Sequence, residues 1–171
     1  MIIEERVERS QYVKLITWIV SFIILMAGIV FPVLILWVNQ DMMSKVIGAS
    51  VLCLIFFTLI FTVAYQPRKL ILSETHIIME RILGQGYISY SDITDISLYH
   101  RENVAEIRIF GIGGLGGYIG KFYNSKIGFY TAYVGDYSQA FLIKINNREK
   151  YVMSCRHAEK IVEEVKSRLK Q

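Results

Sequence analysis

The sequence contains little cysteine and little histidine. Two cysteines and three histidines occur in 171 residues. Cys53 falls inside a long apolar run, and Cys155 lies near the far end of the chain. One pair placed in this way cannot form a disulfide framework, which favours a reducing compartment. Cys155 and His157 are not followed by a second pair of ligands, so the sequence predicts no metal site and no cofactor.

Charge is absent from two long segments, Leu15–Val38 and Val46–Tyr65. At about 1.5 Å per residue, each can cross a hydrocarbon core of about 30 Å. The first is too long for the apolar part of a signal peptide, and no small-residue cleavage site follows it. A buried helical pair in a soluble protein would need more surrounding protein than this chain supplies. The sequence therefore predicts a transmembrane helical hairpin with the loop Asn39–Lys45.

Basic residues flank this hairpin unequally. The two flanks carry Arg6, Arg9, Lys14, Arg68, Lys69 and Arg81, whereas the loop carries only Lys45. Because positively charged flanks stay on the cytoplasmic side, both termini are expected in the cytoplasm of a multi-pass integral membrane protein. No ionisable residue lies within either run, so we expect an anchor and not an ion or proton pathway.

Small residues and a proline bear on how the two helices pack. The small faces are Thr17, Ser21 and Gly28 on the first helix and Ala49 and Cys53 on the second. Such faces let two backbones approach closely, so homo-oligomerisation is left open. Pro32 removes the hydrogen bond to the carbonyl of Gly28, which predicts a kink that is either static or a hinge.

The chain after the hairpin has the pattern of a small β domain. We expect a cytoplasmic tail over 1–14, the hairpin over 15–65 and a cytoplasmic domain over 66–171, with no flexible linker at Gln66-Pro67. The predicted strands are Leu70–Ser73, His76–Ile82, Tyr87–Tyr90, Asp95–Tyr99, Val104–Phe110, Ile127–Val134, Gln139–Asn146 and Lys150–Ser154. Asn146-Asn147 predicts a hairpin turn between the last two.

Two patterns assign buried faces. Ala105-Glu106-Ile107-Arg108-Ile109 alternates strictly, which predicts one buried face and one solvated face. Near the end of the chain, Ala158, Ile161, Val162, Val165 and Leu169 repeat at helical spacing. Ser154 is the predicted N-cap of this helix. One helix with one apolar stripe needs a sheet or barrel to cover.

Three segments resemble bacterial pleckstrin-homology-like (PH) domains. They are Ile77–Arg81, Tyr87–Ile96 and Gly113–Asn124. The resemblance covers roughly residues 66–169. It implies an α+β membrane protein in which the hairpin precedes an antiparallel barrel or sandwich of about seven strands, capped by a C-terminal helix. It also implies a setting at a bacterial plasma membrane, and it brings neither a reaction nor a defined ligand.

A glycine-rich stretch contains a sequence that matches a nucleotide-binding motif. Gly111–Gly116 matches G-x-G-x-x-G, but no helix start and no βαβ unit surrounds it, so dinucleotide binding is not expected. We predict an inter-strand loop whose glycines serve positive φ angles. The aromatic and basic residues that follow are Tyr118, Ile119, Lys121, Phe122, Tyr123, Lys126 and Phe129. They suit either a loop that binds headgroups or a partner, or an aromatic core.

The sequence as a whole favours a non-enzymatic membrane-anchored protein. The net charge of +4 lies beyond residue 65 and is scattered, which permits contact with anionic headgroups and does not suggest nucleic acid. We expect a protein-interaction or scaffolding module with an unidentified protein partner. One alternative is a regulator that responds to anionic lipids, and a weaker one is an accessory subunit of a membrane enzyme or transporter. The candidate contact residues are Arg68, Lys69, Tyr118, Lys121, Phe122 and Lys126.

Overall fold

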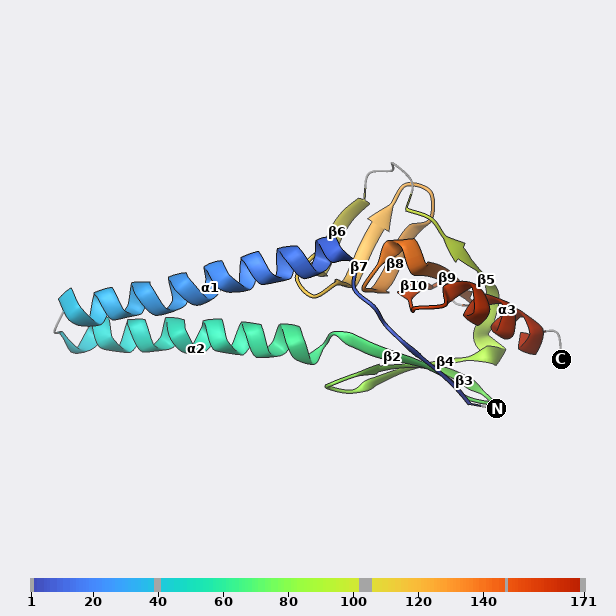
Figure 1. Cartoon of the computed structure of the whole chain (residues 1–171), viewed down its shortest axis with the longest axis horizontal. Helices are drawn as coiled ribbons and strands as arrows, with labels where there is room; N and C mark the ends of the chain where they lie inside the picture. The colour runs from blue at the N-terminus through green and yellow to red at the C-terminus, as the bar shows by residue number, and fades with distance from the viewer. Residues whose placement is uncertain (1, 39–40, 102–105, 147, 170–171) are drawn as a thin grey trace.

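The computed structural model describes residues 2–38, 41–101, 106–146 and 148–169. A short strand comes first, followed by two long helices, a β domain and a final helix (Figure 1). The helices are α1 (Gln11–Val38), α2 (Met42–Ala64) and α3 (Ala158–Leu169). The strands are β1 (Ile3–Arg6), β2 (Pro67–Leu72), β3 (His76–Arg81), β4 (Gln85–Ser89), β5 (Ile93–Tyr99), β6 (Glu106–Gly113), β7 (Tyr118–Asn124), β8 (Gly128–Val134), β9 (Ala140–Ile145) and β10 (Lys150–Ser154). Short 3-10 turns at Tyr90–Asp92 (η1) and Tyr137–Gln139 (η2) precede β5 and β9.

Helices α1 and α2 lie side by side and project away from the β domain (Figure 1). Both are long and apolar enough to cross a membrane. Only 11% of the most apolar window of each is buried, whereas a core helix of a soluble protein would be mostly buried. The predicted pair of apolar helices is therefore confirmed. Residues 39 and 40 of the predicted loop lie outside the described residues.

The small faces of the two helices have different surroundings. Gly28 lies against α2, where an added Cβ would sit 3.2 Å from the Ile55 Cδ1 atom. Ala49 and Cys53 are exposed and line a shallow depression on the outer side of α2. Helix α1 continues through Pro32 to Val38. The close approach of the two helices therefore uses the face of α1 that contains Gly28.

The strands form two sheets. The first has the order β1-β2-β3-β4, and the second has the order β5-β9-β10-β8-β7-β6. All neighbouring pairs are antiparallel except β8 and β10. In the described part of the chain the two sheets do not close into a barrel, so the expected barrel is only partly matched. Strands β1 and β7 lie where the sequence predicted none.

Strand β1 precedes the two long helices in the sequence but belongs to the same sheet as the strands that follow them. It pairs with β2 in the register Ile3↔Leu72 to Arg6↔Lys69. The two long helices are therefore inserted between two strands that are neighbours in space. Residues 3–6, expected as part of a cytoplasmic tail, are in fact an edge strand of the domain.

The main core lies between the two sheets and α3. It includes Leu70, Leu72 and Ile77 from the first sheet, Phe141 and Ile143 from the second, and Ile161 and Val165 from α3. The stripe predicted for the final helix is confirmed, because Ala158, Ile161, Val162 and Val165 are buried and Leu169 packs on the same cluster. A second cluster on the six-stranded sheet includes Tyr99, Phe122 and Tyr130.

Two local predictions are wrong. Ser154 does not cap α3; its hydroxyl oxygen accepts from the backbone N–H of Gly135 at 2.9 Å, and the helix begins four residues later. In β6 neither face is regularly buried: Arg108 is exposed like Ile107 and Ile109, and only the Glu106 side chain, 4% exposed, is covered. The Oε1 atom of Glu106 accepts two hydrogen bonds, whereas its Oε2 atom is buried without a hydrogen-bond partner among the described residues. Val104 and Ala105 of that predicted strand, and Asn147 of the predicted hairpin turn, lie outside the described residues.

Candidate functional site

The glycine-rich stretch is a β-hairpin turn that docks on the base of α1. Strands β6 and β7 pair with Gly113 opposite Tyr118, so Gly114–Gly117 form the turn. The Thr17 hydroxyl oxygen accepts from the backbone N–H of Gly116 at 2.7 Å. It also lies 3.4 Å from the Gly114 carbonyl oxygen. No helix follows these glycines, which excludes the dinucleotide-binding geometry.

A side chain at Gly116 has no room in this turn. Its φ angle is +74°, and an added Cβ would collide with the side-chain amide of Gln66. Gln66 is buried at the end of the hairpin and accepts a hydrogen bond from the Arg9 guanidinium. The positive φ angle and the close approach to the hairpin therefore account for glycine at this position.

Further backbone hydrogen bonds fasten the hairpin to both sheets. The N–H of Leu83, between β3 and β4, donates to the carbonyl of Ala64 at 3.0 Å. The N–H of Ser10 donates to the carbonyl of Gly135, after β8, at 3.2 Å. The hairpin and the β domain consequently form one packed unit, which agrees with the expected absence of a flexible linker.

The structure does not gather the predicted contact residues into one site. Arg68 and Lys69 lie on β2, and Lys69 forms an ion pair with Glu4 at 3.2 Å. Lys121 is exposed on β7, and Lys126 is exposed in the turn after it. These four basic residues therefore belong to two different sheets. A joint headgroup site made from all four stays a prediction.

The two predicted aromatic contacts are wholly or partly inside the fold. Phe122 is 3% exposed and belongs to the second core cluster, so its side chain cannot reach a headgroup or a partner. Tyr118 is half-buried beneath Arg101, whose guanidinium carbon lies 5.1 Å from the ring centroid. The core interpretation of the aromatic stretch thus holds for Phe122, and the exposed aromatic residue is Phe129.

An exposed face of β6, β7 and β8 combines Lys121, Tyr123 and Phe129 of the aromatic and basic stretch with Ile107 and Ile109, which the sequence did not single out for binding. Ile107, Tyr123 and Phe129 lie directly opposite one another on the three strands. Ile109 and Lys121 are next to them and line an open groove of about 470 Å³. The other groove residues are Phe129, Tyr130, Thr131, Arg148, Glu149, Lys150 and Tyr151. We call this surface, with Ile107 and Tyr123 and without the buried side chain of Tyr130, the open face.

A polar cluster occupies the opposite face of the same strands. The Glu106 carboxylate accepts from the Tyr137 hydroxyl at 3.1 Å and from the Arg101 guanidinium at 3.4 Å. Burial raises the pKa of Tyr137 and of the neighbouring Tyr130 well above the usual range. Both phenols therefore stay protonated at neutral pH and act as hydrogen-bond donors. The Arg101 guanidinium lies over the rings of Tyr118 and Tyr137 and so completes the cluster.

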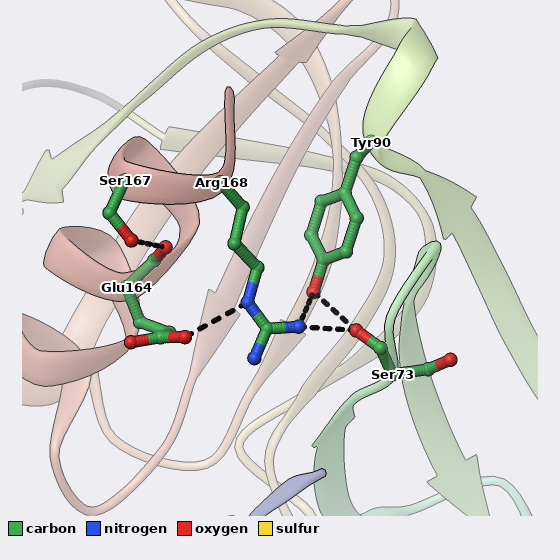
Figure 2. A network of polar contacts seen from close by, with 5 residues as sticks. All are labelled: Ser73, Tyr90, Glu164, Ser167 and Arg168. Carbon is green, nitrogen blue, oxygen red and sulfur yellow. Dashed lines mark hydrogen bonds and ion pairs between the residues drawn. The ribbon is translucent and has the colours of Figure 1, made fainter. Parts of the chain in front are cut away.

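A second network fixes the C-terminal helix (Figure 2). Arg168 donates to the Glu164 carboxylate at 2.9 Å, to the Tyr90 hydroxyl at 3.3 Å and to the carbonyl of Ser73. The Tyr90 hydroxyl donates to the same carbonyl at 3.1 Å. Burial raises the pKa of Tyr90, so this phenol remains a donor. The network ties the end of α3 to the β2–β3 turn and to η1.

Comparison with known families identifies the β domain. A family model for bacterial PH domains matches residues 68–169, which is more than half of the chain. The chain belongs to the bacterial PH domain family. No curated protein and no solved structure matches the sequence. The family match begins inside β2, so β1 and the hairpin precede the matched region, although β1 completes the first sheet of the PH domain.

The PH domain family is generally non-catalytic, and PH domains commonly bind lipids or proteins. Among the described residues, no three histidine, cysteine or acidic side chains are grouped as a metal ion would need. His157, one of the two ligands considered from the sequence, lies 3.0 Å from the Glu5 carboxylate, while Cys155 is buried. The open face combines exposed apolar side chains with basic ones.

Proposed function

We propose that this PH domain protein is a non-enzymatic interaction module held rigidly at the cytoplasmic surface of a bacterial membrane. The hairpin over 15–65 crosses the membrane twice, both termini are cytoplasmic, and the domain over 66–171, completed by β1, recruits a protein partner. The observation that carries the proposal is the insertion of the hairpin between β1 and β2. Because only residues 7–10 separate β1 from α1 and only Tyr65 and Gln66 separate α2 from β2, the domain has no long tether on which to drift from the membrane.

The open face is the surface that we assign to the partner. It combines the exposed apolar side chains Ile107, Ile109 and Phe129 with the basic residues Lys121 and Arg148. Exposed apolar side chains that gather on one face commonly mark interaction sites, and β6 is also the edge strand of its sheet. Lys150 adds a third positive charge, against the single acid Glu149. The matching partner therefore presents apolar side chains together with acidic ones.

Photo-crosslinking in the native membrane tests this assignment. A photoreactive amino acid is placed at Phe129, and proteins that become covalently attached to the full-length chain are identified by mass spectrometry. The matched control carries the same amino acid at Tyr87, which is also exposed but lies on β4 of the other sheet. We expect one protein to attach through Phe129 and not through Tyr87.

Charge reversal provides the second half of the test. The double variant Lys121→Glu/Arg148→Glu should reduce the yield of that crosslink without changing the amount of protein in the membrane. The proposal fails if the two positions capture the same set of proteins, or if charge reversal leaves the crosslink yield unchanged.

A further inference from the structure

Two turns of the PH domain lie against the hairpin at the ends of its apolar runs. The β3–β4 turn contains Ile82 and Leu83, and its backbone is bonded to Ala64, the last residue of α2. The β6–β7 turn contains Leu115 and is bonded to Thr17 of α1. Figure 1 shows both turns at the end of the domain from which the hairpin leaves.

The positions of these bonds along the helices set the depth of the turns. The uncharged run of α1 begins at Leu15, so Thr17 already lies inside it. The uncharged run that contains α2 ends at Tyr65, so Ala64 also lies inside its run. When the hairpin crosses a bilayer, both turns are therefore held where the hydrocarbon begins and water becomes scarce.

The chemistry of the turns suits this depth. Ile82 and Leu83 are 51% and 58% exposed, and neither is needed to fill the core. No charged residue occurs from Gly111 to Gly120. Backbone polar groups at this level need partners other than water, and the turn supplies them. The N–H of Gly114 donates to the carbonyl of Gly117 at 2.9 Å, and the N–H of Gly116 donates to Thr17.

Aromatic and basic residues beside the turns match the headgroup layer. The Arg81 guanidinium carbon lies 5.6 Å from the centroid of the Tyr65 ring, directly before the β3–β4 turn. Lys14 is exposed on α1, one residue before its uncharged run. Tyrosine and basic side chains concentrate at this level of a membrane, where the ring is partly buried and the charge stays hydrated.

We propose that the β3–β4 turn and the β6–β7 turn insert into the interfacial layer of the bilayer on either side of the hairpin. This inference rests on the proposed membrane crossing of the hairpin. It gives the PH domain four attachments to the bilayer, two helices and two turns, which fix the tilt of the domain as well as its distance. The surfaces involved differ from the open face, which remains available to a protein partner.

Site-directed spin labelling of the full chain tests the inference. Single cysteines are introduced in a Cys53→Ala/Cys155→Ala background, labelled with a nitroxide and reconstituted in vesicles of phosphatidylcholine and phosphatidylglycerol. The test positions are Leu83→Cys and Leu115→Cys. Ser125→Cys, in the exposed β7–β8 turn at the other end of β7, is the water reference. Leu25→Cys, exposed in the middle of α1, is the lipid reference.

Collision rates with oxygen, which concentrates in lipid, and with a nickel chelate, which stays in water, report the depth of each label. We expect more oxygen collisions and fewer nickel collisions at positions 83 and 115 than at 125. The inference is overturned if either turn matches position 125 while position 25 reports lipid, an outcome that leaves the hairpin proposal intact. If position 25 also reports water, the membrane crossing itself is wrong.

Discussion

Cys155 is a buried thiol whose ionisation is linked to folding. It lies in the main core next to α3, and burial raises its pKa from 9.0 to about 12. The folded state therefore holds the proton more strongly than the unfolded state does. The resulting contribution to stability is complete below pH 9 and is lost as the pH rises from there towards about 12.

Replacing this thiol should change how stability depends on alkaline pH. At neutral pH the variant Cys155→Ala is expected to differ from the parent by a constant amount, set by packing. Between pH 9 and about 12 the difference should move in favour of the variant, because the variant has no thiol to ionise. Burial also raises the pKa of Tyr151 to about 12, but this residue titrates in both proteins and cancels in the comparison. Thermal unfolding in detergent at several pH values measures the effect, and a pH-independent difference would contradict it.

The β6–β7 turn is one of the elements that join the domain to the hairpin, and this contact requires its glycines. Gly116→Ala should destabilise the protein by about 1–3 kcal/mol, because a residue with a side chain is strained at positive φ and displaces the buried Gln66 amide. The matched control is Gly86→Ala on β4, where an added Cβ meets Met79 Cβ only at 4.0 Å. The control should change stability by about 0.5 kcal/mol or less. Denaturant unfolding followed by near-ultraviolet circular dichroism compares them, and equal losses would refute the role assigned to the turn.

At the scale of the whole molecule, the hairpin is an insertion into a sheet that can be closed without it. The chain leaves the domain after β1 and returns at β2, where Val7 still donates to the carbonyl of Arg68 at 3.0 Å and Arg9 reaches Gln66. The two ends of the hairpin are therefore close enough for a short loop to join them.

Replacing residues 11–64 with a short glycine-serine loop should give a soluble, folded PH domain that keeps β1. A shorter chain that starts at Gln66 lacks β1 and exposes the edge of β2, which includes the unpaired backbone beside Leu70 and Leu72. We expect this chain to unfold at a lower temperature and to aggregate. Size-exclusion chromatography and thermal unfolding distinguish the two. Equal behaviour would mean that β1 is dispensable.

Sequence periodicity and composition were sufficient for the features that depend on near neighbours. The two uncharged runs predicted α1 and α2, and the apolar stripe from Ala158 to Leu169 predicted α3. The family resemblance also held over residues 68–169. The sequence also anticipated that the domain follows the hairpin without a linker, because no flexible residues separate Tyr65 from the first strand.

Only the tertiary structure decided which of these elements meet. Strand β1 has no apolar run of its own, and its partner β2 is more than sixty residues away along the chain, so no local pattern could reveal it. The alternation in β6 predicted one buried face, but the buried residue there is Glu106, which accepts from the hydroxyl of Tyr137, 31 residues further along the chain. The glycine-rich turn likewise binds the hydroxyl of Thr17, which lies 99 residues before Gly116 in the sequence. Local sequence determines periodicity, whereas the surface that covers each face is supplied by distant segments.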